Sequence, residues 1–287
     1  MSEKNKIQVI HLKKKYETSD TKKSLLFSKN INPDAVFAGA EEGYVLNDVS
    51  LEIKEGEFHI FLGASGCGKS TLLNIIAGFL DKTEGKVLLD GKEIRKPGRD
   101  RGVVFQNADS AIFPWLNVYR NVEYGLKVQK VNKAKRKEIV QNALELVGLS
   151  EHARKYPSEL SGGMKQRVQI ARSIASDPEI LIMDEPFGAL DAQTRRTLQD
   201  ELIQIWQKTG KTILFVTHDL QEAVYLGQRI SIFSAAPDAN IATRVEVPFA
   251  YPRDLNAPEV TTFTAEVHQK LDEAINAHGT SDVDKSA

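Results

Sequence analysis

The chain has 287 residues, with 38 Lys or Arg and 39 Asp or Glu, so its formal net charge is -1. This length is sufficient for one large hydrophobic core or a core with a smaller lobe, and the balanced charge excludes an overall basic field for nucleic acid. The first residues are charged and no apolar run approaches the ~18 residues of a membrane helix, so neither a secretory signal nor a membrane span is expected. The single cysteine, Cys67, cannot form an internal disulfide.

Short apolar strands alternate with helical patterns along the chain, which predicts an α/β fold with a mostly parallel sheet. In chain order, the predicted elements are strands over 8–12 and 58–62, a helix over 71–77, a strand over 103–105, a helix over 133–147, and strands over 180–183 and 212–216. Residues from about 107 to 176 lose the strand pattern, so we expect a helical subdomain inserted in the sheet domain. Residues 18–42 are mostly polar and predict an atypical insertion between two early strands.

A phosphate-binding loop is predicted between the strand over 58–62 and the helix over 71–77. The loop matches the pattern GxxxxGKS and consists of Gly63, Ala64, Ser65, Gly66, Cys67, Gly68, Lys69 and Ser70, followed by Thr71. Its glycines allow backbone N–H groups to turn towards phosphate oxygens, and the following helix adds the positive end of its dipole. Lys69 is expected to neutralise the β and γ phosphates, and the Ser70 hydroxyl can ligate Mg²⁺. A guanine nucleotide is disfavoured, because the nearest match to the base-reading NKxD motif, at residues 132–135, lacks the acidic residue.

Polar side chains are predicted at the carboxyl ends of three strands, which is where open α/β sheets bind ligands. Asp184 and Glu185 follow one strand, Gln106 ends another, and His218 follows a third. Asp184 is expected to hold Mg²⁺ through its water shell, and Glu185 to orient and deprotonate the water that attacks the γ phosphate. The Gln106 amide can ligate Mg²⁺ and hold that water, while the His218 imidazole can donate a hydrogen bond to the γ phosphate.

A second anion site is predicted where Ser161, Gly162 and Gly163 precede a helical run that extends to Ile174. The phosphate loop already provides one complete phosphate site, so this helix start is expected to serve the nucleotide of another copy of the chain. In a two-fold dimer, this signature, Ser161 to Gly163, would close over the ATP held by the partner subunit. Taken in isolation, the same pattern fits a glycine-rich turn before an ordinary helix equally well.

These motifs, in this order, resemble the ATP-binding subunits of ABC transporters over about residues 7–250. The resemblance implies a P-loop NTPase core with a mostly parallel sheet, an antiparallel β subdomain and an inserted helical subdomain, forming one ATPase domain over 1–250. A C-terminal helix and a disordered tail are expected over 251–287. The implied ligands are ATP and Mg²⁺, and Ser161, Gly162 and Gly163 are expected to bind the γ phosphate of the partner's ATP.

The resemblance also implies an aromatic residue near the N-terminus that stacks on adenine. Tyr16 is preferred because it follows the first predicted strand, as the family's aromatic residue does. Tyr44 is the alternative, because the insertion over 18–42 separates Tyr16 from the phosphate loop. Stacking of this kind contributes ~1 to 3 kcal/mol and discriminates poorly between bases.

Residues 111–118 and 229–254 are similar to segments of ABC importers for nitrate, taurine and other sulfonates. In that family, the region after the glutamine that corresponds to Gln106 forms a groove for a short helix of the membrane subunit. Phe113 and Trp115 are expected either to line such a groove or to pack inside the helical subdomain.

The predicted protein is a dimeric ATP hydrolase that powers a separate permease importing a small anion, peripheral to the cytoplasmic face of the membrane. A substrate-binding protein is expected as an indirect partner, and nucleic acid is not. The alternatives are a soluble ABC ATPase that clamps DNA or a ribosome, and an importer ATPase of the glycine betaine type.

Overall fold

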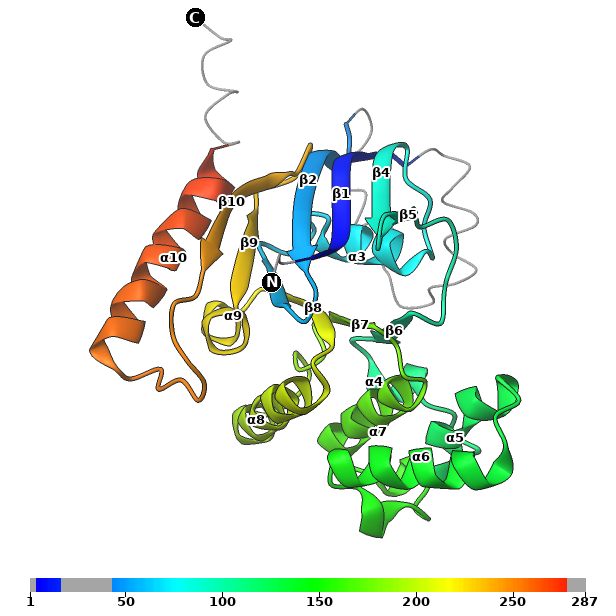
Figure 1. Cartoon of the computed structure of the whole chain (residues 1–287). Helices are drawn as coiled ribbons and strands as arrows, with labels where there is room; N and C mark the ends of the chain where they lie inside the picture. The colour runs from blue at the N-terminus through cyan, green and yellow to red at the C-terminus, as the bar shows by residue number, and fades with distance from the viewer. Residues whose placement is uncertain (1–3, 17–42, 278–287) are drawn as a thin grey trace, which may run out of the picture. The chain divides into compact units, whose positions relative to one another are not determined.

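The computed structural model describes residues 4–16 and 43–277, which form two compact units (Figure 1). The described residues within Met1–Pro97 and Val216–Ala287 form unit 1, and Gly98–Phe215 form unit 2. The predicted insertion over 18–42 and the last residues of the predicted tail lie outside the described residues. No helix in the described part of the chain is long and apolar enough to cross a membrane.

Unit 1 contains a four-stranded antiparallel sheet in the order β2-β1-β4-β5. Its strands are β1 (Asn5–Lys14), β2 (Leu46–Lys54), β4 (Glu84–Leu89) and β5 (Lys92–Glu93). Ile7 and Val9 alternate onto the buried face of β1, and a register shift follows before the next buried residue, Leu12. His11, in this irregular stretch, has a φ of 47°. The extra residue of such a bulge returns the strand to the core face.

The other strands of unit 1 lead to the phosphate loop and to the C-terminal helix. They are β3 (Phe58–Leu62), β9 (Arg229–Phe233) and β10 (Ile241–Glu246), with helices α3 (Lys69–Ala77), α9 (Leu220–Leu226) and α10 (Pro258–Asn276). β3 pairs parallel with β9, and β9 pairs antiparallel with β10. Every residue of β3 is buried, as expected for a parallel strand covered on both faces. Helix α10 packs on β9, β10 and α9 (Figure 1).

Unit 2 combines a parallel strand pair with a group of helices. Its strands are β6 (Arg101–Val104) and β7 (Ile180–Asp184), and the boundary between the units falls within β8 (Thr212–Thr217). Its helices are α4 (Ala108–Ala111), α5 (Val118–Val128), α6 (Lys133–Leu146), α7 (Gly162–Ala175) and α8 (Ala192–Thr209), with 3₁₀ turns η1 (Ser150–His152) and η2 (Pro157–Glu159). Helix α7 contacts α4, α5, α6 and α8, so it is the central helix of this unit.

The predicted strand over 103–105 ends one residue earlier than expected, because β6 stops at Val104. Helix α7 supplies the reason. The Phe105 N–H donates to Gln169 Oε1 at 3.1 Å, and Gln169 Nε2 donates to the Phe105 carbonyl at 3.2 Å. A side chain therefore takes both backbone groups of Phe105. With parallel and antiparallel pairing in the strands and helices packed on them, the predicted α/β fold class is confirmed.

Candidate functional site

The phosphate loop of unit 1 has a backbone that requires glycine at two points. Gly66 and Gly68 have φ values of 83° and 90°, in the left-handed region that side chains disfavour. A Cβ at Gly68 would also lie 2.6 Å from Leu46 Cδ2 and 3.1 Å from the Val45 carbonyl oxygen. Gly68 is the N-cap of α3 and provides no capping side chain, so the helix start presents backbone N–H groups to the loop. The exposed members of the loop are Ser65, Gly66 and Ser70.

The Lys69 side chain lies within the loop rather than in solvent. Its ammonium donates to the carbonyl oxygens of Gly63 at 2.8 Å and Ala64 at 2.7 Å, and the residue is buried. The positive charge is thus held where the loop would surround a phosphate. Burial raises the pKa of the neighbouring Cys67 thiol, whose sulfur lies 3.6 Å from Lys69 Nζ. Cys67 is therefore a small neutral side chain that fills the inside of the loop.

Of the two candidate aromatic residues, Tyr16 is the one whose side chain reaches the phosphate loop. Its hydroxyl lies 3.3 Å from Thr71 Oγ1, at the start of α3. The Tyr44 hydroxyl instead donates to Glu84 Oε1 at 3.1 Å, on β4 of the antiparallel sheet. The contact with Thr71 favours Tyr16.

His218 is held between the end of β8 and a well-anchored short helix. It is exposed, and the next residue, Asp219, is the N-cap of α9. The far end of α9 is capped by the buried Arg253, whose Nη1 donates to the carbonyl oxygens of Val224, Tyr225 and Gly227. Because both ends of α9 are capped, the position of His218 is fixed from the C-terminal segment as well as from the sheet.

In unit 2, the end of β7 brings together two of the predicted polar residues. β7 is buried from Ile180 to Met183, and Asp184 and Glu185 emerge at its carboxyl end. Gln106 Nε2 donates to Glu185 Oε2 at 3.4 Å, so these two side chains meet although the residues are distant in sequence. Glu185 has a φ of 42°, which is uncommon for a residue with a side chain.

The signature forms the start of α7, as its sequence indicated. Ser161 is the N-cap and accepts a hydrogen bond from the Met164 N–H at 3.3 Å. Ser161 and Gly162 are exposed, whereas Gly163 is buried. A Cβ at Gly163 would lie 2.5 Å from Thr194 Cγ2, so glycine is also required here for the close approach of α7 and α8.

The segment after Gln106 presents an aromatic surface patch, defined here as Phe113, Trp115 and Tyr124. The ring centroid of Phe113 lies 5.5 Å from that of Trp115 and 4.6 Å from that of Tyr124. Trp115 is 69% exposed, so it does not pack inside the helical part of unit 2. The fully buried Asn121 shapes this segment by accepting from the Phe113 N–H at 2.8 Å and donating to the Phe113 carbonyl at 3.1 Å.

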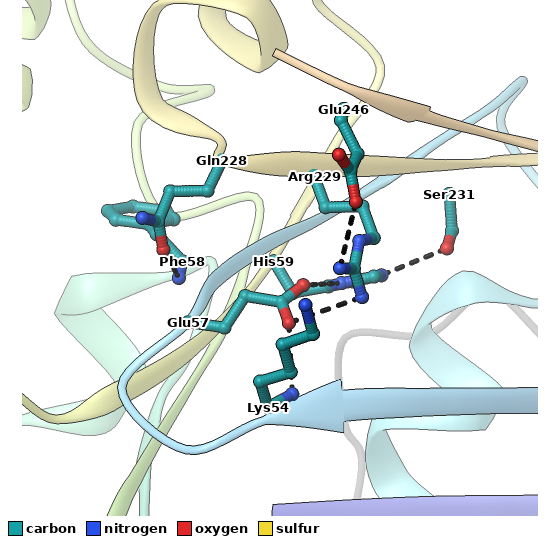
Figure 2. A network of polar contacts seen from close by, with 8 residues as sticks. All are labelled: Lys54, Glu57, Phe58, His59, Gln228, Arg229, Ser231 and Glu246. Atoms are coloured by element: carbon teal, nitrogen blue, oxygen red, sulfur yellow. Dashed lines mark hydrogen bonds and ion pairs between the residues drawn. The ribbon is translucent and has the colours of Figure 1, made fainter. Parts of the chain in front are cut away.

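A buried polar network in unit 1 contains a glutamate, a histidine and a serine in the order of a hydrolase triad (Figure 2). His59 Nδ1 lies 2.7 Å from Glu57 Oε1, and its Nε2 lies 2.9 Å from Ser231 Oγ. His59 and Ser231 are 0% exposed, so no substrate reaches them. Arg229 extends the network from Glu57 to the exposed Glu246 on β10. The network joins β3 to β9 and β10.

The predicted site residues fall into two groups. Unit 1 carries the phosphate loop from Gly63 to Thr71, Tyr16 and His218, and unit 2 carries Gln106, Asp184, Glu185 and the signature from Ser161 to Gly163. The sequence motifs do not indicate Asn121 and Gln169, the buried amides that hold the backbone at Phe113 and Phe105. The available signal was an amide among the buried apolar positions of a helix.

Comparison with known proteins gives sequence and structural matches over this region. A family model described as ABC transporter matches residues 46–188. The taurine import ATP-binding protein TauB of Rhizobium johnstonii is 48% identical over 218 residues, which cover 75% of the chain and 82% of the relative. The nitrate import ATP-binding protein NrtD of Synechococcus elongatus is 46% identical over 214 residues, which cover 74% of the chain and 77% of the relative. A solved dimeric ATP-binding cassette in a post-hydrolysis state, bound to ADP and phosphate, aligns with a TM-score of 0.66 and 30% identity. The alignment covers 85% of the present chain and 100% of the solved cassette.

Proposed function

Because the chain belongs to the ABC transporter family of ATP-binding subunits, we propose that it hydrolyses ATP as a dimer and powers a separate membrane permease that imports a small anion. Membership of the family and the P-loop NTPase fold predicted from the sequence are thereby confirmed. The observation that carries the proposal is the phosphate loop, with its two left-handed glycines and its internal Lys69 ammonium.

ATP is proposed to bind with its phosphates in the loop from Gly63 to Ser70 and its adenine on Tyr16. The Lys69 ammonium is already fixed by two carbonyl oxygens, so little reorganisation is needed for it to face the β and γ phosphates. The contact between the Tyr16 hydroxyl and Thr71 ties the ring to the end of the loop.

The residues proposed to hold Mg²⁺ are Ser70, Gln106 and Asp184. Their hydroxyl, amide and carboxylate oxygens are hard donors, and Mg²⁺ prefers few such ligands combined with waters and substrate phosphates. When bound, Mg²⁺ would neutralise charge on the phosphate oxygens. The donor chemistry of this chain therefore fits the metal.

Glu185 is proposed as the general base. A water oxygen attacks the γ phosphorus, the bond from that phosphorus to the β–γ bridging oxygen breaks, and the Glu185 carboxylate accepts the proton of the water. The hydrogen bond from Gln106 Nε2 orients this carboxylate, and the Gln106 amide is near enough to hold the same water. His218, exposed after β8, is proposed to donate a hydrogen bond to the γ phosphate.

Two copies of the chain are proposed to form two composite ATP sites. The exposed Ser161 and Gly162 at the start of α7 would contact the γ phosphate of the partner subunit's ATP, as an anion site at a helix N-terminus does. The dimeric cassette bound to ADP and phosphate supports this assembly.

The aromatic surface patch is proposed to receive the permease at the cytoplasmic face of the membrane. Exposed apolar patches on soluble domains mark interaction surfaces, and the 69% exposure of Trp115 is high for an indole. Asn121 holds the backbone beneath Phe113 rigid, so the patch keeps its shape for a docking helix.

The imported anion is proposed to be a sulfonate such as taurine, or nitrate, the solutes in the names of two relatives. The test is to reconstitute the ATPase with its cognate permease and binding protein, and to measure ATP turnover with taurine, alkanesulfonates, nitrate, bicarbonate and glycine betaine. We expect several-fold stimulation by one of the anions and none by betaine. Stimulation by betaine alone would reassign the substrate, and co-purification with nucleic acid in place of the permease would refute import.

A further inference from the structure

Gln169 lies in the middle of α7 and holds the residue immediately before Gln106. Its amide makes two hydrogen bonds to one residue, accepting from the Phe105 N–H and donating to the Phe105 carbonyl, at 3.1 and 3.2 Å. Gln166 Oε1 also accepts from Gln169 Nε2, at 3.3 Å, which fixes the orientation of the amide. Gln169 is fully buried, so water does not replace these bonds.

The residue that follows Phe105 is Gln106, whose side chain pairs with Glu185. Phe105 and Gln106 are consecutive, and Phe105 is the first residue beyond the end of β6. The hydrogen bonds between Gln169 and Phe105 thus fix the backbone from which the Gln106 side chain extends to Glu185. Gln106 Nε2 lies 3.4 Å from Glu185 Oε2.

Helix α7 also carries the signature at its first residues. Ser161 caps the helix and Gln169 lies two turns along it, so one rigid element holds both. A displacement of the signature end would displace Gln169, and with it Gln106.

We infer that Gln169 is a positioning residue that couples the signature helix to Gln106, and through Gln106 to Glu185. Engagement of Ser161 by the partner subunit's ATP would then set Gln106 in this subunit's own ATP site, which links the two composite sites. The inference rests on the proposed roles of Gln106 and of the signature.

The placement of α7 itself does not depend on Gln169 alone. Ser173 Oγ donates to the Val103 carbonyl at 3.1 Å, and Arg172 Nη1 donates to the Ala111 carbonyl at 2.7 Å. These bonds tie the same helix to β6 and α4. Removing the Gln169 contacts is therefore expected to release Phe105 while α7 stays in place.

The test uses the full chain assembled with its permease and the substitution Gln169→Met. This substitution keeps the side-chain length and removes both hydrogen bonds to Phe105 and the one to Gln166. We expect kcat for ATP to fall about 10-fold, since small displacements of catalytic groups cost up to 100-fold, with KM for ATP changed less than about 2-fold. The matched control is Ser173→Ala, which removes one buried bond between the same helix and β6. The control is expected to keep kcat within about 2-fold.

A double-mutant cycle separates positioning from general damage. In a Gln106→Ala background, Gln169→Met should cause no further loss of kcat, because the group that it positions is absent. Additive losses, or equal losses in Gln169→Met and Ser173→Ala, would overturn the inference. If Gln106→Ala alone retains normal kcat, the proposed role of Gln106 fails instead.

A second variant keeps the inference testable if Gln169→Met does not fold. Gln166→Met removes only the acceptor that orients the Gln169 amide, and it is expected to lower kcat about 3-fold in the wild-type background and not at all beside Gln106→Ala. A Gln166→Met protein with unchanged kcat would count against the inference.

Discussion

Glu185 combines a strained backbone with the carboxylate proposed as the general base. Its φ of 42° lies in the left-handed region, which costs energy for a residue with a side chain, and its carbonyl accepts from the Gly188 N–H at 3.2 Å in the turn after β7. The buried strand and this turn together enforce the conformation. The carboxylate leaves this turn and accepts the hydrogen bond from Gln106 Nε2 at 3.4 Å.

Replacing Glu185 by glutamine keeps this geometry and removes the base. Glu185→Gln is expected to bind ATP with wild-type affinity but to hydrolyse it at least ~100-fold more slowly, in line with the usual contribution of a general base. Phosphate release and binding of a fluorescent ATP analogue would be measured on the same preparation. Turnover within a few-fold of wild type would remove Glu185 from the role of base.

Gly163 is subject to two structural constraints, and the signature motif reveals only one of them. The sequence predicts a helix start at the signature, and the structure has one, capped by Ser161. The second constraint on Gly163, the 2.5 Å approach of a Cβ to Thr194 Cγ2, involves a residue of α8. Such a constraint depends on how two helices pack, which the pattern of one helix does not contain.

At the scale of elements, β3 depends on the buried network of Glu57, His59 and Ser231 (Figure 2). Burial lowers the pKa of His59, so the imidazole stays neutral in the folded protein. Burial acts to raise the pKa of Glu57, but the hydrogen bond to His59, together with the Lys54 N–H and Arg229, lowers it overall. Since β3 leads directly into the phosphate loop, protonation in this network would disturb the strand that positions the loop.

The network predicts acid-sensitive stability. In the unfolded chain, His59 titrates near its ordinary pKa of about 6.5, whereas the folded protein resists that proton, so its contribution to stability is complete above pH 6.5 and decreases as the pH falls below it. Glu57 adds a further loss below about pH 4.3. We expect the free energy of unfolding, measured with urea between pH 8 and 5, to fall below pH 6.5 by up to about 1.4 kcal/mol per pH unit from His59.

His59→Gln provides the comparison, because glutamine hydrogen-bonds without titrating. This variant should be less stable at pH 8 but should show a shallower slope between pH 6.5 and 5. The matched control is His268→Gln, which removes an exposed imidazole on α10. An unchanged slope in His59→Gln would assign the acid sensitivity to other groups.

Elements bounded by local signals are predictable from this sequence, and elements bounded by distant contacts are not. β3 and β7 are apolar runs that end at a glycine turn or an acidic residue, and their predicted cores lie within the observed strands. The end of β6 differs by a residue because Gln169, 64 positions away, binds Phe105. The contact between His59 and Ser231 likewise spans 172 positions, so local patterns do not reveal it.

At the scale of the whole molecule, the signature and the phosphate loop belong to different units of one chain. The sequence predicts a dimer from this duplication of anion sites, and the dimeric cassette among the solved structures supports the same assembly. In the proposed dimer, the exposed Ser161 and Gly162 would contact the partner subunit's nucleotide. Dimer closure and hydrolysis should therefore be lost together when the signature is altered.

Ser161→Arg tests this dependence, because a long cationic side chain at the start of α7 would block the partner subunit's phosphate. ATP binding by the phosphate loop of the same chain should remain within a few-fold of wild type, while ATP hydrolysis falls to background. In the Glu185→Gln background, which is expected to accumulate the ATP-bound dimer, adding Ser161→Arg should leave only monomer in size-exclusion chromatography with ATP.

Loss of a helix cap must be separated from loss of the composite site. Ser161 accepts a hydrogen bond from the Met164 N–H, and removing such a cap costs about 1 kcal/mol. Asn132→Arg is the matched control, since Asn132 caps α6 in the same unit by accepting from the Ala134 N–H at 2.9 Å. Equal thermal destabilisation with normal ATPase activity in the control would confine the defect of Ser161→Arg to dimer closure. Normal ATPase activity in Ser161→Arg itself would show that the signature does not complete the partner subunit's site.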